Sequence, residues 1–126
     1  INQRPSCEVV GFINEILQGE PFGNFVEISY TSGLNPSALT LELYSDSGLP
    51  TQTFSLTDAI GGATIDGLKF NYFTLESSTS AGGFALSRTD LQFAEVLHFV
   101  SVGLPFVAIS GIAVGRTATS IGVPTQ

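Results

Sequence analysis

Residues 12–30 read FINEILQGEPFGNFVEISY and decide the class of fold. Two apolar stretches flank a loop that contains Gly and Pro, the residues that most often interrupt regular structure. In the second stretch the apolar Val26 and Ile28 alternate with the polar Glu27 and Ser29. A period of two is typical of a half-buried β-strand, so this stretch predicts two strands joined by a short loop.

The same period of two recurs along most of the chain. It appears at residues 39–44, 51–56, 69–76, 84–87 and 94–102, and the segments between them are rich in Gly, Pro, Asn, Asp and Ser. No stretch shows a sustained helical period. Seven or eight short strands with turns at nearly regular spacing predict an all-β fold, an antiparallel β-sandwich.

Length and composition favour one domain with few charges. The chain has 126 residues, which fits a single domain with a real core. Apolar residues make up 43% of the chain and charged residues 12%, whereas about a quarter is the usual charged share. Either the surface is rich in uncharged polar side chains or neighbours cover part of it, and both can hold together.

The charge balance excludes some partners. The net charge is −7, and the only cations are Arg4, Lys69, Arg88 and Arg116. Nucleic-acid binding needs clustered Lys and Arg, so we expect no nucleic-acid partner. No apolar run approaches the length of a membrane span, so we expect no membrane insertion. An acidic chain rich in Ser and Thr suits an extracellular or cell-surface location.

The N-terminal residues carry the single cysteine. Cys7 cannot form a disulfide within this chain, which leaves a bond to another chain or segment, or a buried thiol. Residues 1–6 are polar and include a proline, so we expect a polar arm over residues 1–7 and a sandwich domain over 8–126. The chain begins at Ile1 without a signal-peptide pattern, so we expect any signal peptide to lie upstream or to have been removed.

Two ends of the chain carry a family resemblance. The stretches VVGFINEIL (9–17) and NFVEISYTSG (24–33), and the later run from GFALS to IGV (83–123), resemble lamin-tail-like domains. The match spans about residues 9–123, although residues 56–80 agree only in strand pattern. The resemblance implies an immunoglobulin-like sandwich without catalytic activity, of the kind found with nucleases, phosphatases, surface anchors or in intermediate-filament tails.

One departure from the family concerns the C-terminal end. In lamin-tail-like domains the Ile-Gly-Val stretch is commonly followed by one more core strand, whereas this sequence ends at Gln126. If that strand is missing, a sheet edge and an apolar groove stay open. Exposed backbone donors and acceptors recruit another chain.

The carboxylates of the opening stretch allow three interpretations. The carboxylates of Glu15 and Glu27, with Asn14 beside the first, could form an acid/base pair, form a cation site, or be solvated side chains. We favour the last interpretation, because strand ends need polar partners for their backbone groups. Asn14 and Glu15 are then expected to bond the backbone at the end of the first strand, while Glu27 faces outward.

Other candidate motifs also favour structural roles. His98 is the only histidine, and no serine elbow lies near it, so we expect a packed or interface histidine and no zinc site. The run GIAVGRT (111–117) lacks the lysine and spacing of a phosphate loop, and predicts two glycines at positive φ.

Loop acids and tyrosines give weak signals for ligands. Asp46, Asp58 and Asp66 lie in expected loops without calcium-loop spacing, so solvated acids are favoured over a weak Ca²⁺ site. Three tyrosines and no tryptophan form a poor stacking surface for sugars. We therefore expect no cofactor.

These observations favour a non-catalytic extracellular module that associates with copies of itself or with other extracellular proteins through strand edges and apolar patches. The alternative is an accessory module of a larger secreted nuclease or phosphatase that binds a surface, a glycan or a cation. Some Phe positions fall in loops or on the polar phase of a strand, which suggests an interface. The expected interface residues are Cys7, Phe22, Phe25, Phe73, Phe106, Thr117, Ile121 and Val123.

Overall fold

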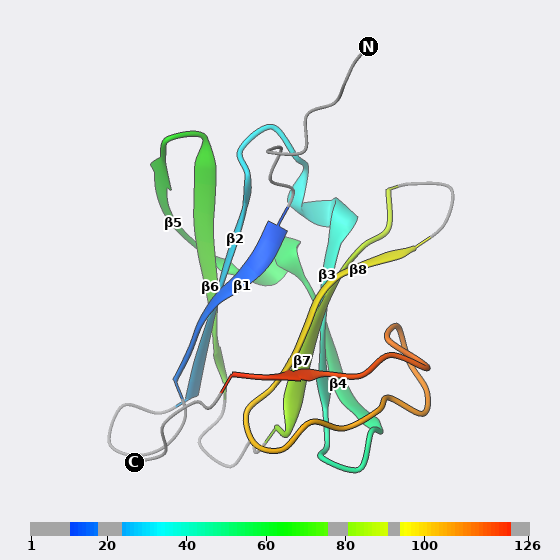
Figure 1. Cartoon of the computed structure of the whole chain (residues 1–126). Coiled ribbons are helices and arrows are strands. Elements are labelled where there is room, and N and C mark those ends of the chain that lie inside the picture. Colours follow the sequence, from blue (N-terminus) through cyan, green and yellow to red (C-terminus); the bar gives the residue numbers. More distant parts are fainter. Residues whose placement is uncertain (1–10, 18–23, 76–80, 91–93, 122–126) are drawn as a thin grey trace.

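The computed structural model describes residues 11–17, 24–75, 81–90 and 94–121 (Figure 1). Within these ranges the chain forms nine strands and two 3₁₀ turns. The strands are β1 Gly11–Leu17, β2 Asn24–Thr31, β3 Leu39–Tyr44, β4 Pro50–Ser55, β5 Ile60–Ile65, β6 Leu68–Leu75, β7 Gly83–Arg88, β8 Glu95–Ser101 and β9 Thr119–Ser120, and the turns are η1 Pro36–Ala38 and η2 Leu56–Asp58.

The strands form two sheets, and the predicted all-β sandwich is confirmed. The first sheet has the order β1-β2-β6-β5 and the second the order β4-β3-β7-β8-β9. The first order is the A-B-E-D order of immunoglobulin domains, and β4-β3-β7-β8 corresponds to C′-C-F-G. All pairs are antiparallel except β8 with β9, which is parallel.

Two strands were not among the predicted seven or eight, the two-residue β9 and the edge strand β5. The run DAIGGATIDG, expected to be a turn, contains the edge strand β5, which pairs with β6 across a bulge between Gly61 and Thr64. A Cβ added at Gly62 would lie 2.3 Å from the Phe70 carbonyl oxygen, so glycine is needed for this close approach. The glycines therefore shape a strand here instead of ending one.

The core lies between the two sheets. Alternate residues of each strand point into it, as the period of two predicts. Its fully buried members include Val26, Ile28, Leu41, Leu86 and Val100. Burial of each such side chain contributes about 1.5–3 kcal/mol, and this packing holds the sheets face to face.

The outer face of the second sheet is covered by the chain itself. Residues 104–118, the covering segment, run across β3, β7 and β8 and add a second buried cluster (orange in Figure 1). In this cluster the ring of Phe99 lies 5.2 Å from that of Tyr44 and 5.6 Å from that of Phe106. Ala108, Ala113 and Ala118 fill the space above the sheet, and all three are buried.

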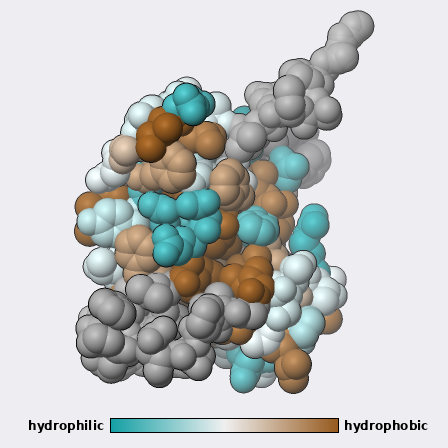
Figure 2. Space-filling model, turned by 60° about the vertical axis from the view of Figure 1, so that its left-hand side comes forward, coloured by the Kyte–Doolittle hydropathy of each residue, from teal (hydrophilic) through white to brown (hydrophobic). Residues whose placement is uncertain are grey.

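The outer face of the first sheet has no such cover among the described residues. Its outward phase carries Phe12, Phe25, Phe70 and Tyr72, and all four are partly exposed. Figure 2 brings the β5 side of the molecule forward and shows hydrophobic side chains around a hydrophilic patch. Ser29 pairs in register with both Phe12 and Phe70 and is fully buried.

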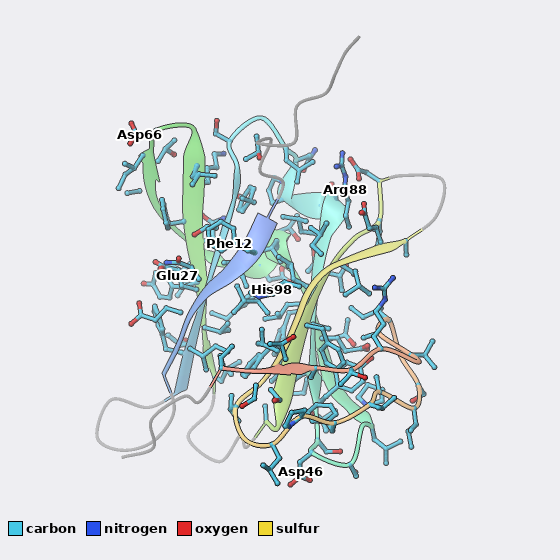
Figure 3. All side chains as sticks on the ribbon, viewed as in Figure 1. Phe12, Glu27, Asp46, Asp66, Arg88 and His98 are labelled. Carbon is cyan, nitrogen blue, oxygen red and sulfur yellow. The ribbon has the colours of Figure 1, made fainter. Side chains whose placement is uncertain are left out.

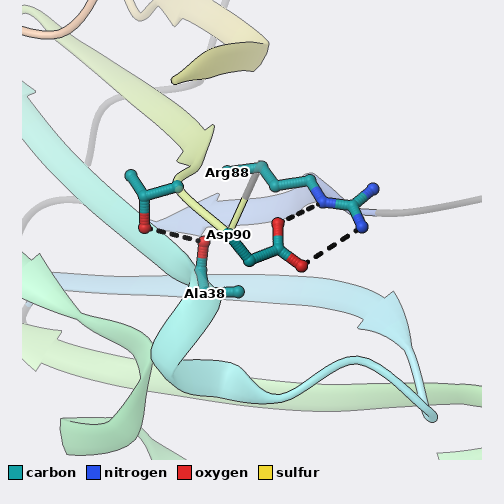
Figure 4. A network of polar contacts seen from close by, with 4 residues as sticks. Ala38, Arg88 and Asp90 are labelled. Carbon is teal, nitrogen blue, oxygen red and sulfur yellow. Dashed lines mark hydrogen bonds and ion pairs between the residues drawn. The ribbon is translucent and has the colours of Figure 1, made fainter. Parts of the chain in front are cut away.

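Polar contacts fasten the end of β7 to η1. The Thr89 amide and hydroxyl both donate to the Ala38 carbonyl, at 2.7 and 3.3 Å (Figure 4). The Arg88 guanidinium donates two hydrogen bonds to Asp90, and this contact holds the pKa of the Asp90 carboxyl below its ordinary value. The turn after β7 is therefore anchored to the start of β3.

Candidate functional site

The stretch Asn14-Glu15 lies inside β1, at a β-bulge. The register shifts between Ile13 and Glu15, and Glu15 stands opposite Glu27 of β2. Asn14 Nδ2 donates to Glu27 Oε1 at 2.8 Å. The prediction that Asn14 bonds the backbone at a strand end is wrong, because β1 continues to Leu17 and the bulge turns the Asn14 amide toward the carboxylate.

His98 connects the two sheets. Its Nδ1 accepts a hydrogen bond from the Ile13 amide of β1 at 2.9 Å, and Figure 3 places the ring between β1 and β8. An accepting Nδ1 requires the neutral imidazole with its proton on Nε2. Burial lowers the pKa of His98 and favours this neutral form. The histidine is packed and bonded to backbone, which agrees with the structural interpretation of it.

Glu42 and Tyr44 hold the covering segment to the sheet. Glu42 Oε1 accepts from the Ile112 amide at 2.8 Å, and Oε2 accepts from Thr53 Oγ1 at 2.9 Å. The Tyr44 hydroxyl lies 2.8 Å from the Ser110 carbonyl oxygen and 3.0 Å from Glu42 Oε1, two acceptors for its single proton. Burial, followed by the adjacent Glu42, raises the pKa of Tyr44 to about 12.

This polar cluster was not predicted from the sequence. Glu42 occupies the polar phase of β3 and so reads as a solvent-facing residue, yet it is only 7% exposed because the covering segment lies above it. The prediction for GIAVGRT is confirmed, since Gly111 and Gly115 both have positive φ. A Cβ at Gly111 would lie 2.5 Å from Glu42 Oε1 and from the Tyr44 hydroxyl, so the glycine is required there.

The predicted aromatic interface residues are distributed over three environments. Phe73 is only 6% exposed, so its placement on the surface is wrong; it pairs in register with Val26 and shares that residue's inward phase. Phe25 is partly exposed on the outer face of the first sheet, 5.2 Å from the ring of Tyr72. Phe106 is half-buried in the second cluster.

The other predicted interface residues lie near the end of the chain or outside the described residues. Thr117 is exposed and forms a bridge with Val107. Ile121 is 44% exposed, directly after β9. Cys7, Phe22 and Val123 fall outside the described residues. The predicted residues that the structure describes therefore do not form one surface.

Two apolar surfaces were missed from the sequence. The first, the sheet face, combines the exposed Ile60 and Ile65 of β5 with the partly exposed aromatic side chains of the first sheet, Phe12, Phe25, Phe70 and Tyr72. The second, the loop face, consists of exposed side chains on the covering segment and the adjoining β3–β4 turn, namely Leu49, Leu104, Val107, Ile109 and Val114. Exposed aliphatic side chains in expected loops carry no periodic signal, which explains the omission.

The loop acids are spread over separate turns. Asp46 lies between β3 and β4, Asp58 in η2, and Asp66 between β5 and β6. In the part of the chain that the structure describes, no three His, Cys, Asp or Glu residues lie close enough together to hold a metal ion. Across the same residues, neither helical turn has the length and apolar character needed to cross a bilayer.

Comparison of the chain with protein-family models, with curated proteins and with solved structures found no match. The resemblance to lamin-tail-like domains therefore stays a prediction.

Proposed function

We propose that this chain is a non-catalytic extracellular building block that assembles with copies of itself through a strand edge and apolar surfaces. The observation that carries the proposal is β5. It is an edge strand, all six of its residues are exposed, and its sequence IGGATI contains no charge and no proline. Monomeric sandwiches commonly protect such an edge with lysine, proline, a β-bulge or a covering loop. The bulge at Gly62 is the only one of these devices in the strand.

The two apolar surfaces lie on different sides of the sandwich. The sheet face belongs to the first sheet, whereas the loop face lies over the second sheet. Contact between two unlike surfaces is heterologous and builds open chains or rings, whereas a self-complementary surface builds a closed dimer. The covering-segment part of the loop face carries no charge, since residues 101–115 contain no Asp, Glu, Lys or Arg. A head-to-tail contact between the sheet face and the loop face is the arrangement that this distribution favours.

Sedimentation velocity over a wide concentration range tests the proposal. We expect higher-order species at high concentration for the wild type. Ile65→Lys and Leu49→Lys each place a charge on one apolar surface at an exposed site and should weaken association about tenfold or more. Gln52→Lys makes a comparable charge change at an exposed site on β4 and should leave association unchanged.

A mixture of two blocked variants separates the modes of assembly. In head-to-tail assembly, Ile65→Lys and Leu49→Lys each retain one intact surface, so a 1:1 mixture forms dimers that grow no further. If only Ile65→Lys weakens association, the contact is a symmetric pairing of sheet faces. A wild type that stays monomeric at every concentration would overturn the proposal and favour the accessory-module alternative.

A further inference from the structure

A hollow of about 390 Å³ lies beside β8, at the point where the covering segment leads into β9. It arises because β9 pairs with Val100 and Ser101 only, so the chain just before β9 is free to bond elsewhere. Residues 116–118 bond instead to the earlier part of the covering segment and away from β8: the Ala118 amide donates to the Phe106 carbonyl, and the Arg116 carbonyl accepts from the Ala108 amide. The two segments diverge and leave a gap between them.

The hollow is rich in hydrogen-bond donors and holds one full positive charge. Its polar lining comes from Arg116, Thr117, Thr119 and His98. A guanidinium offers five N–H donors, each hydroxyl offers one, and a neutral imidazole whose Nδ1 already accepts a bond carries its proton on Nε2. None of the lining residues is acidic, so the site has donors without a carboxylate of its own.

Arg116 is set apart from the other described cations, Lys69 and Arg88, because it alone lines the hollow. Arg88 bonds Asp90, whereas the Arg116 side chain makes no ion pair or hydrogen bond within the described part of the chain. The chain has 11 acidic and 4 basic residues, so an unpaired guanidinium in a hollow is an exception to its overall charge.

We propose that this hollow binds a carboxylate group. The planar fork of Arg116 matches a carboxylate with two parallel hydrogen bonds, and Thr117 and Thr119 also line the hollow. Val96, Leu97 and Phe99 complete the lining. This site is distinct from both apolar surfaces and does not depend on the proposed self-association.

An NMR titration with 3-phenylpropanoate tests the site, with the neutral 3-phenylpropanamide as a matched ligand at the same ionic strength. We expect saturable shifts confined to the amides of residues 96–99 and 116–119, with a dissociation constant of about a millimolar. The amide should bind roughly tenfold more weakly, because it cannot form the charge-assisted pair.

Two substitutions locate the binding group. Arg116→Gln should weaken 3-phenylpropanoate binding roughly tenfold, and its fold is preserved because the exposed side chain makes no contact that stabilises the segment. Lys69→Gln removes the same charge from the first sheet and should change binding by less than about twofold. The proposal would be overturned by any of three results: the acid and the amide bind equally, Arg116→Gln leaves binding of the acid unchanged, or the shifts spread over the whole surface.

The carboxylate can come from a small molecule or from an acidic side chain of a second copy. If amides 96–99 and 116–119 shift with protein concentration alone, and acetate reverses those shifts, the source is another copy. If the amides respond only to added carboxylate, the source is a free ligand. Both outcomes support the site, and each is independent of whether Ile65→Lys alters assembly.

Discussion

The two sheets of this sandwich treat their outer faces in opposite ways. The second sheet is covered by residues 104–118, and the polar pair Glu42 and Tyr44 is buried beneath them. The first sheet leaves Phe12, Phe25, Phe70 and Tyr72 partly exposed, with the uncharged edge β5 beside them. The apolar side chains on the outer face of the second sheet are buried by the chain itself. Those on the outer face of the first sheet are accessible to solvent or to a partner.

This comparison shows what decides whether an outward-facing aromatic residue of a sheet is buried. Tyr44 and Tyr72 sit on the outward phase of different sheets, yet Tyr44 is fully buried and Tyr72 is partly exposed. Strand pattern alone does not distinguish them. What separates them is a glycine at Gly111 that allows a backbone to approach the Tyr44 hydroxyl.

The largest expected effect comes from breaking the cover. Gly111→Ala places a Cβ against Glu42 and the Tyr44 hydroxyl at positive φ, so we expect the free energy of unfolding to fall by about 3 kcal/mol. Gly115→Ala is the matched control, because its φ is +82° and no atom lies within 4 Å of the added Cβ. That variant should lose about 1 kcal/mol. Equal losses for both variants in urea denaturation would contradict close packing of the cover.

The next effect compares one substitution on the two faces. Tyr44→Phe removes a hydroxyl bonded to the Ala113 amide and to the Ser110 carbonyl, and leaves buried groups unpaired, so a loss of about 2 kcal/mol is expected. Tyr72→Phe on the open face should change stability by less than about 0.5 kcal/mol. Thermal unfolding of both variants provides the measurement, and similar losses would show that the open face is covered too.

A smaller effect of opposite sign is expected for two buried hydroxyls. Ser29 on the first sheet and Ser87 on the second are fully buried, and neither hydroxyl has a hydrogen-bond partner. Changing either residue to alanine removes the cost of burying an unpaired group, so stability should rise by about 1 kcal/mol. If Ser87→Ala stabilises the protein and Ser29→Ala does not, water reaches Ser29 and the open face is more loosely packed.

The smallest effect concerns the junction of the sheets. Burial holds the pKa of His98 below its ordinary 6.5, so the unfolded chain takes up the proton first as pH falls. The stability contribution is therefore fully present above pH 6.5 and declines below it toward the lower pKa of the folded state.

Urea denaturation at pH 7.5 and pH 5 measures this loss. His98→Gln keeps an acceptor for the Ile13 amide without titrating, so its stability should change less between the two pH values than that of the wild type. An identical pH dependence in wild type and variant would assign the effect to carboxylates elsewhere.

The fold was accessible from the sequence, whereas the surfaces were not. Alternation at Val26, Ile28 and Leu41 reports which side of a strand is buried, because side-chain direction follows the strand period. It cannot report what lies above the other side, so nothing in the pattern indicates that Glu42 is buried. The hydrogen bond between His98 and Ile13 joins residues 85 positions apart, and no local pattern encodes such a pairing.

The contact between Glu42 and the Ile112 amide has a consequence for how the protein forms. These groups are 70 residues apart, and the covering segment leaves the ribosome only after every strand of its platform except β9. Pairing over such separations is slow, and domains are synthesised from their N-terminal end. A nascent chain thus exposes both sheet faces at once, and the apolar surface around Tyr44 stays open until residues 104–118 have been synthesised and cover it.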